Sequence, residues 1–283
     1  LDAERAVAIA LVNNPGLQAT YASLGVSQAD MLQAGLLSNP TLSVDVGLPV
    51  AGGLLELGGS IVQSFLDVFM LPLKREVAQE QFLADMKTVA HAALDTVAEV
   101  KTELLALQAA EQRLALHRES LAAIEADADL AQRQRDAGNI NALDLSQRAV
   151  EHQQARIDVA SDELDIIAHR ERLNRLLGLW GPRTEWKLAE ALPALPAKDP
   201  DLEDLEALAL RQRLDVAAAR HQVALLDTGA RLARTFRYVG RFDVGAHTHQ
   251  DPNGPFLIGP DVSIELPIFD QRQALIGRLE SQR

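Results

Sequence analysis

The chain has 283 residues, of which 47% are apolar and only 4% aromatic. Its formal net charge of −13 excludes the common nucleic-acid-binding proteins, which present a basic face to phosphates, and disfavours docking on an anionic membrane surface. Because the chain has no cysteine, disulfides and thiolate metal sites are also excluded. It contains no run of 18 apolar residues, so the sequence predicts no transmembrane helix.

Residues 1–38 are predicted to form a first helix. Alanine and leucine recur there at helical spacing from about residue 2 to residue 37, and Asn39-Pro40 ends the pattern. A second proline follows Asn14 inside this stretch, where it should kink or break the helix.

Residues 39–73 are predicted to form a β-hairpin. From Leu42 to Leu48 the side chains alternate between apolar and polar, which is typical of a strand with one face of each kind. Glycines at positions 52, 53, 58 and 59 predict a loop. A second strand is expected from Ser60 to Leu71, ending at Pro72.

Residues 74–178 are predicted to form a coiled-coil helical hairpin. The first arm, about 74–135, lacks proline and glycine and has apolar residues near heptad spacing: Val100, Leu104, Leu107, Leu114, Leu121 and Ile124. Ala137-Gly138-Asn139 predicts a reversal, which places the tip near 136–144. The second arm, about 142–177, has Ile157, Ala160, Leu164 and Ile167 on one face, and the two arms should pair antiparallel.

The rest of the chain repeats part of this order. A proline-rich linker (179–201) precedes a helix (202–236) and a second hairpin (237–268), whose strands alternate around residues 242–246 and 262–266 with a turn at 251–254. Residues 269–283 are expected to begin a further helical hairpin.

Three short matches support an internal duplication of about 198 residues. Ala10-Leu11 matches Ala209-Leu210, Asp45-Val46-Gly47 matches Asp243-Val244-Gly245, and Leu71-Pro72 matches Leu266-Pro267, at offsets of 199, 198 and 195. The second copy is expected to be truncated, because only about 16 residues follow its Leu-Pro pair.

This order of elements resembles the TolC-like outer-membrane efflux family. Several local sequences are similar to motifs of that family: Asn14-Pro15-Gly16-Leu17, Ser38-Asn39-Pro40-Thr41-Leu42, Arg135-Asp136-Ala137-Gly138-Asn139-Ile140, Leu176-Leu177-Gly178 and Leu266-Pro267-Ile268-Phe269-Asp270. The resemblance implies a mainly α fold with a small β part. It also implies a homotrimer in the outer membrane of a Gram-negative bacterium, in contact with outer-membrane lipid, where each protomer gives four strands to one shared 12-stranded barrel.

The same resemblance implies two protein partners in the cell envelope. The helices would form a tunnel through the periplasm, and the hairpin tip would meet a periplasmic adaptor protein that couples the tunnel to an inner-membrane pump. The strand pattern agrees on physical grounds, because four amphipathic strands cannot close a barrel alone and must pair their open edges with other copies. The aromatic residues near the strands would form only a weak girdle at the membrane interfaces: Phe65, Phe69, Tyr238, Phe242 and Phe269.

Two groups of residues are candidate sites. For adaptor docking, the resemblance points to the tip: Arg135, Gly138, Asn139, Ile140, Leu143 and Asp144. The alternative for the tip is a plain turn, with Asn139 as a cap and Gly138 at a positive φ. Four acidic residues are expected on the lumen-facing side of the strands, where they would favour cations or simply solvate a polar face: Asp45, Asp67, Asp243 and Glu265.

Other chemistry is weakly indicated or excluded. His247 and His249 are a weak metal candidate, because two imidazoles fall short of the three or four ligands that a firm site needs. The helical histidines at 91, 117, 152, 169 and 221 lack ligand spacing, and most are expected to be solvated. No phosphate loop or nucleophile elbow occurs, so neither an enzyme nor a cofactor is predicted.

The sequence therefore predicts a passive exit duct, the outer-membrane channel subunit of a tripartite efflux system for drugs, metal ions or other exported substrates. Two alternatives remain: a soluble coiled-coil scaffold, and a periplasmic metal-handling protein that uses His247 and His249.

Overall fold

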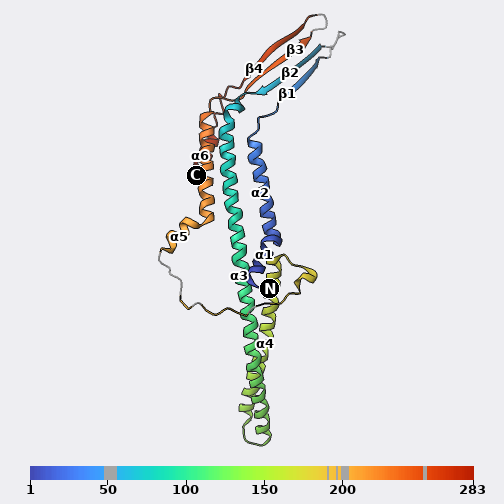
Figure 1. Cartoon of the computed structure of the whole chain (residues 1–283), viewed down its shortest axis with the longest axis vertical. Coiled ribbons are helices and arrows are strands. Elements are labelled where there is room, and N and C mark those ends of the chain that lie inside the picture. Colours follow the sequence, from blue (N-terminus) through green and yellow to red (C-terminus); the bar gives the residue numbers. More distant parts are fainter. Residues whose placement is uncertain (48–55, 190, 196, 199–203, 251–253) are drawn as a thin grey trace. The chain divides into compact units, whose positions relative to one another are not determined.

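The structure is a computed structural model that describes residues 1–47, 56–189, 191–195, 197–198, 204–250 and 254–283 (Figure 1). The chain divides into two compact units. The first comprises Leu1–Tyr21 and Ala90–Leu205, and the second comprises Ala22–Val89 and Glu206–Arg283.

The first unit begins with α1 (Ala3–Asn13) and the start of α2 (Pro15–Ala34), so the predicted break at Asn14-Pro15 is confirmed. Asn14 serves both sides of the break. Its Oδ1 accepts a hydrogen bond from the Leu17 amide at 2.9 Å, which caps α2, and its Nδ2 donates to the Leu176 carbonyl at 2.9 Å. Asn14 is therefore the C-cap residue of α1, where its backbone amide donates to the Ala10 carbonyl, and its side chain caps α2 and ties the break to the hairpin.

The hairpin of the first unit pairs α3 (Leu66–Asp136, here from residue 90 onward) with α4 (Ala142–Leu177). Its core lies at the end away from the tip, where α1 packs against both arms. Seven fully buried side chains form it: Ala6, Ala10, Val100, Leu104, Leu107, Leu173 and Leu177. The predicted seam positions of the first arm, Val100, Leu104 and Leu107, are confirmed.

The predicted packing face of the second arm is wrong. Ile157, Leu164 and Ile167 are 60%, 67% and 58% exposed, and Ala160 is exposed as well. The seam instead uses Ala155, Asp162, Leu173, Asn174 and Leu177. The apolar pattern misleads because Asp162 occupies a buried seam position that a carboxylate rarely fills unless it is paired.

After the seam, α4 ends at Gly178, which adopts a left-handed conformation at φ 63°. A short 3₁₀ helix (Gly181–Thr184) follows, and the start of the linker folds back onto α4. Trp186 Nε1 donates to Asn174 Oδ1 at 2.8 Å, and the Arg170 guanidinium stacks over the Trp186 ring at 4.3 Å.

The second unit holds a four-stranded antiparallel sheet in the order β1-β2-β3-β4. The strands are β1 (Thr41–Gly47), β2 (Glu56–Ser64), β3 (Phe242–Gln250) and β4 (Phe256–Ile264). Four strands are therefore confirmed. The expected turn at 251–254 lies mostly outside the described residues, as does much of the loop predicted around positions 52 and 53.

Three strand boundaries differ from the prediction. The extent predicted for the second strand, Ser60 to Leu71, is wrong, because β2 ends at Ser64 and α3 starts at Leu66 with Pro72 inside it. Leu66 and Met70, one helical turn apart, are buried on one face. This helical spacing of buried residues favours a helix, although the composition of the segment is typical of a strand. Gly58 and Gly59, assigned to a loop, lie within β2, and the last strand ends at Ile264 rather than at Pro267.

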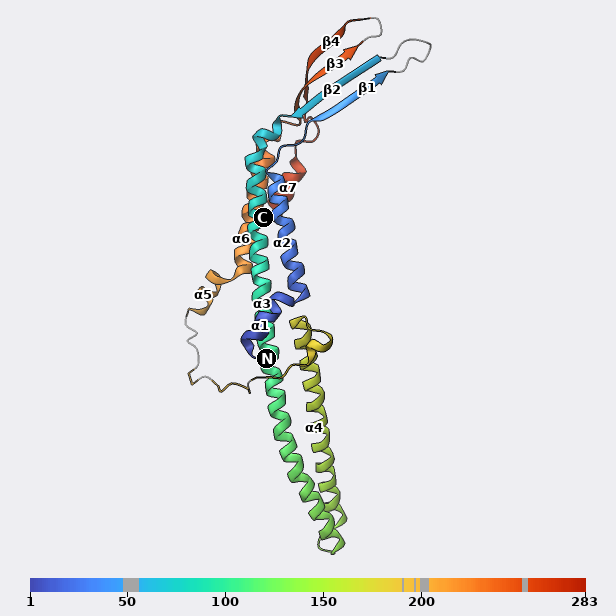
Figure 2. The same cartoon turned by 45° about the vertical axis from the view of Figure 1, so that its right-hand side comes forward.

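Helices accompany the sheet in this unit. The single helix expected at 202–236 is two helices, α5 (Leu205–Gln212) and α6 (Leu214–Thr235), separated at Arg213, and α7 (Gln273–Gln282) follows the sheet. Within the unit, α2 and α6 run along α3 (Figure 2). His221 Nδ1 lies 2.7 Å from Glu80 Oε2, and Ser27 donates to Asp85 at 2.6 Å. No helix in the described part of the chain is long and apolar enough to cross a membrane.

Candidate functional site

The tip of the hairpin is a tight reversal between Asp136 and Ala142. Gly138 has φ 78°, as predicted, and its amide donates to the Arg135 carbonyl at 2.9 Å, while the Asn139 amide donates to the Gln134 carbonyl at 2.8 Å. The next helix is capped by Asn141, whose Oδ1 accepts from the Asp144 amide at 2.9 Å. Asn139 thus takes part in the cap at the end of α3 through its backbone amide, whereas the N-cap of α4 is Asn141.

Of the six predicted docking residues, Arg135 lies in the last turn of α3, and the other five lie on the reversal or in the first turn of α4. Arg135 Nη1 donates to the Ile140 carbonyl at 2.9 Å, and this hydrogen bond links the end of α3 to the loop. Ile140 is half-buried, whereas the Leu143 side chain is 67% exposed. The tip therefore combines a stiff backbone with an apolar side chain that has no cover within the hairpin.

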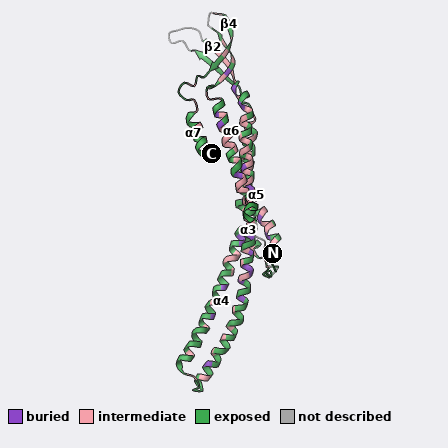
Figure 3. Cartoon of the chain, turned by 90° about the vertical axis from the view of Figure 1, so that its left-hand side faces the viewer, coloured by how far each residue is buried: buried purple, intermediate pink, exposed green. Residues whose placement is uncertain are grey.

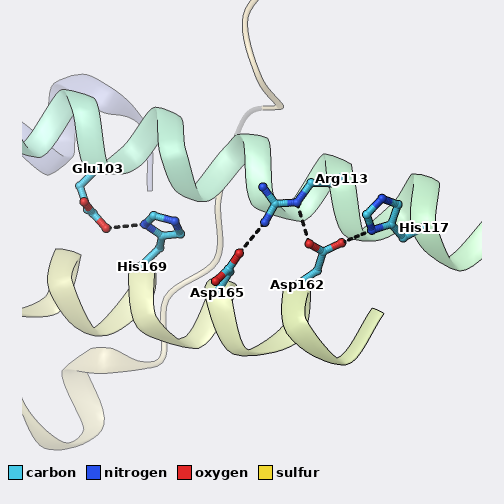
Figure 4. Close-up of polar contacts among 6 residues, drawn as sticks. All are labelled: Glu103, Arg113, His117, Asp162, Asp165 and His169. Carbon is cyan, nitrogen blue, oxygen red and sulfur yellow. Dashed lines mark hydrogen bonds and ion pairs between the residues drawn. The ribbon is translucent and has the colours of Figure 1, made fainter. Parts of the chain in front are cut away.

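A ladder of ion pairs crosses the seam between α3 and α4 (Figure 4). Arg113 lies at its centre, with Nε 2.6 Å from Asp162 Oδ1 and Nη2 2.6 Å from Asp165 Oδ2. His117 Nδ1 lies 2.7 Å from the other oxygen of Asp162. Oδ1 of this buried carboxylate thus accepts a hydrogen bond from Arg113, whereas Oδ2 lies at ion-pair distance from His117 without the geometry of a hydrogen bond.

The electrostatics of Asp162 follow from this arrangement. Burial alone would raise the pKa of its carboxyl, but the hydrogen bond and charge of Arg113, followed by the interaction with His117, together lower this pKa below its usual range. The hydrogen bond to Asp162 in turn raises the pKa of Arg113. Asp162 is 4% exposed, so it is held as a carboxylate in a mainly apolar seam.

The ladder continues toward the base of the hairpin, where His169 Nδ1 lies 2.6 Å from Glu103 Oε1. The expectation that most helical histidines are solvated is therefore wrong. His117, His169 and His221 each pair with a carboxylate, and the His169 and His221 side chains are only 22% and 29% exposed. These pairs were missed because they depend on the antiparallel register, which no local spacing reveals.

The sheet has two chemically different faces, set by its register. Partnered rows such as Val44, Gly59, Thr248 and Ile258 lie on one face, and rows such as Ser43, Ser60, His247 and Gly259 on the other. The first face is mainly apolar, with Gln63, Thr248 and Gln250 as its polar residues. Its exposed apolar side chains are Leu42 (74%), Val44 (70%), Val46 (54%), Leu57 (51%), Ile61 (52%), Val244 (41%), Phe256 (57%), Ile258 (71%), Val262 (58%) and Ile264 (58%). The predicted alternation is thus confirmed across the sheet.

The four predicted acidic residues divide between two places. Asp45 and Asp243 lie on the polar face of the sheet, where Arg241 Nε pairs with Asp243 at 2.6 Å. Glu265 follows β4, and Asp67 lies in the first turn of α3, so its expected position on a strand is wrong. Hydrogen bonds from Lys74, at 2.7 Å, and from Ser38 lower the pKa of Asp67.

The histidines of β3 do not assemble a metal centre. His247 and His249 both lie on the polar face, with the His247 ring over Gly259, where an added Cβ would meet the ring at 2.9 Å. Within the described residues, no group of three histidine or acidic side chains is placed to hold a metal ion.

Sequence and fold comparisons agree with this architecture. The family model described as outer membrane efflux protein matches residues 6–179, more than half of the chain. The chain belongs to this family. It is 29% identical over 270 residues to outer membrane protein OprJ of Pseudomonas aeruginosa, covering 90% of this chain and 53% of OprJ. It is 26% identical to cobalt-zinc-cadmium resistance protein CzcC of Cupriavidus metallidurans, covering 96% of this chain and 64% of CzcC.

The solved outer membrane channel CmeC of Campylobacter jejuni has the same fold. The two structures superpose with a TM-score of 0.80 at 12% identity, over 99% of this chain and 65% of CmeC. The chain thus spans between about half and two thirds of the length of these proteins.

Proposed function

We propose that this chain belongs to the outer-membrane channel subunit of a tripartite efflux system in a Gram-negative bacterium, and that it forms a passive exit duct. The two-faced sheet is the observation that carries the proposal. An exposed, mainly apolar face is costly in water but favourable against lipid, and a polar opposite face suits a water-filled lumen. The alternative of a soluble coiled-coil scaffold does not explain an exposed apolar sheet face.

Closure of the sheet would require other copies of the chain. In the described structure β1 and β4 are edge strands, whose free backbone groups could not remain unpaired in hydrocarbon. Pairing of β4 of one protomer with β1 of the next, three times over, would give a closed 12-stranded barrel. The recurrence of helix, hairpin and helix around β1-β2 and β3-β4 is consistent with an internal duplication.

A row of exposed side chains on α4 supports neighbouring helices in the assembly. Leu143, Val150, Ile157 and Leu164 follow one another at intervals of seven residues and are 67%, 68%, 60% and 67% exposed. A strict heptad is the pattern that a second helix covers in a coiled coil. In the proposed trimer, helices of adjacent hairpins cover this row and close the wall of a periplasmic tunnel. Figure 3 shows how much of α4 is exposed in the single chain.

The tip is the proposed docking point for a periplasmic adaptor, which links the duct to an inner-membrane pump. Its support is the braced reversal at Gly138 together with the exposed Leu143. For the exported substrate, the family includes a relative named for cobalt, zinc and cadmium resistance, so metal ions and drugs are both candidates. The polar face of the sheet, with Asp45, Asp243 and His247, would line the exit.

Paired cysteine variants of the full-length protein test the membrane position of the sheet. These 283 residues contain no native cysteine, so Ser43→Cys and Val44→Cys each add one thiol to this part of the protein, on adjacent residues of opposite faces; any cysteine elsewhere in the protein is replaced by serine in both variants. In outer membranes, the thiol of Ser43→Cys should react with a membrane-impermeant maleimide at least about tenfold faster, because thiolates form only where water is present.

A lipid-embedded quencher supplies the converse measurement. It should quench a fluorophore attached at position 44 more strongly than one at position 43. Equal labelling rates at both positions, or recovery of the protein in the soluble fraction, would refute the channel proposal.

A further inference from the structure

A pocket of about 520 Å³ lies within the second unit, where the strands meet the helices. Its wall combines Ser38, the end of β2, the start of α3, the residues between α6 and β3, and the segment between β4 and α7. The charged residues that matter most are Asp67, Lys74, Arg237, Arg241, Glu265 and Arg272. We refer to this as the junction pocket.

The carboxylates of the junction pocket are already engaged. Asp67 pairs with Lys74 at 2.7 Å, and Glu265 Oε2 accepts from the Arg241 amide at 3.0 Å. Asp270, also in the wall, accepts from the Arg272 amide at 2.8 Å. Arg241 itself is paired with Asp243. The anionic groups of the pocket therefore have partners of their own.

Two guanidinium groups retain unused donors. Arg237 Nε is buried and has no hydrogen-bond partner in the described structure, while Nη2 makes only a 3.4 Å contact with Gln271. The Tyr238 ring stacks on this guanidinium at 4.6 Å and fixes its plane. A buried donor without a partner carries a desolvation cost that a bound acceptor would remove.

Arg272 is the second unengaged cation, and its backbone is unusual. It has φ 60°, a left-handed conformation that favours glycine, and no described residue forms a hydrogen bond or ion pair with its guanidinium. It also precedes the first turn of α7, whose free amides favour an anion. A strained arginine beside a cavity points to a retained binding role.

The neighbouring side chains are strongly apolar and exposed. Tyr238, Leu266, Ile268 and Phe269 flank residues of the pocket wall in sequence and are 66%, 71%, 68% and 91% exposed. Exposed apolar side chains would thus lie next to an anionic group bound in the pocket. This combination of fixed arginines and exposed apolar side chains suits the headgroup and acyl chains of an anionic lipid.

We propose that the junction pocket binds a phosphate group through Arg237 and Arg272, and that a membrane lipid headgroup or free inorganic phosphate supplies it. Arg237 and Arg272 both line the pocket, and guanidinium groups match the planar, bidentate hydrogen bonding of a phosphate. The site goes beyond the proposed export function, because phosphate binding requires neither adaptor nor pump.

Binding should be measured on the full chain in a neutral detergent with two probes, inorganic phosphate and dihexanoyl phosphatidylglycerol below its micelle concentration. Dihexanoylglycerol, which lacks phosphate, is the matched control for acyl contacts. Saturable binding of either phosphate-bearing probe supports the site. Binding of the lipid at least about tenfold tighter than phosphate identifies a headgroup, and equal affinities identify free phosphate.

Three variants locate the binding. Arg237→Gln and Arg272→Gly should each weaken phosphate binding by on the order of tenfold, as expected for loss of a charge-assisted contact. Arg272→Gly also relieves the left-handed strain, so its thermal stability should equal or exceed that of the wild type. Arg278→Gln makes the same charge change on an exposed position of α7 outside the pocket and should bind like the wild type.

The proposal is overturned if neither phosphate-bearing probe binds saturably, or if Arg237→Gln and Arg272→Gly both bind as tightly as the wild type. Its failure is separable from failure of the export proposal. Cysteine labelling of the sheet reports the membrane position whether or not phosphate binds, and phosphate titration in detergent reports the pocket whether or not a channel forms.

Discussion

Leu173→Ala should be among the most destabilising single changes in the first unit. Leu173 is 0% exposed and packs in a cluster with Ala6, Val100, Leu104 and Leu177. Loss of three carbon atoms removes about 2.4 kcal/mol of transfer free energy. The cavity adds to this, because the neighbours belong to separate helices whose backbones cannot close the gap. The expected loss is therefore roughly 3–5 kcal/mol in the free energy of unfolding.

Leu164→Ala is the matched control, with the same chemical change nine residues earlier on the same helix. Its side chain is 67% exposed in the chain, so the expected change is within about 0.5 kcal/mol when the protein is dilute and monomeric. Together the two variants test which face of α4 forms the seam.

Urea unfolding followed by tryptophan fluorescence provides the assay. Trp186 reports on the first unit, because its indole donates to the buried Asn174, and Trp180, which is 75% exposed, is replaced by phenylalanine in every sample. A local probe is needed because the chain has two compact units, so unfolding of the whole chain cannot be treated as one two-state transition. Equal losses in both variants, or a larger loss for Leu164→Ala, would show that the seam runs along the face predicted from the sequence.

Two further predictions concern the hairpin. Gly178→Ala should cost more in unfolding free energy than Gly138→Ala: both have positive φ, worth about 1–2 kcal/mol, but only at Gly178 would the new Cβ meet a neighbour, the Asn13 carbonyl oxygen at 2.3 Å. The same urea titration measures both, and equal costs would contradict the clash. The lowered pKa of Asp162 predicts that its contribution to stability is complete well above pH 3.8 and is lost as pH falls through the lower folded value. A stability profile from pH 7 to 2 should therefore fall less steeply in Asp162→Asn than in the wild type, and parallel profiles would contradict this.

Local signals explain which parts of the fold could be predicted. The bounds of α4 follow from Asn141, which caps its start, and Gly178, which ends it in a left-handed conformation. The break at Asn14-Pro15 follows from the missing amide of proline, and the two faces of the sheet follow from alternation with a period of two. Each of these signals lies within a few residues of the feature that it predicts.

The remaining features depend on partners far apart in the sequence. Asp162 and His169 interrupt the apolar pattern of the α4 seam. Their partners Arg113 and Glu103 lie 49 and 66 residues earlier, and these pairs allow polar side chains at the two positions. The start of α3 was missed for a related reason. Phe65, Val68 and Phe69 have strand-like character, and the burial of Leu66 and Met70 against the rest of the unit decides the conformation.

The distribution of packing along the hairpin bears on how the tip could move. At the base, Leu104, Leu107, Leu173 and Leu177 are all at most 2% exposed. From Arg113 toward the tip, the buried apolar side chains in the described structure are Leu114, Ala131 and Ala155, and a cavity of about 430 Å³ lies beside Ala155 and Ile124.

Fewer buried contacts mean a smaller free-energy cost for local opening, so the tip half can separate or twist while the base stays closed. The ion pairs of Asp162 lie where the well-packed base gives way to this looser half, and they fix the register there through direction-specific contacts rather than through apolar packing. A partner that binds the exposed Leu143 could therefore reshape the tip without unfolding the helices that hold it.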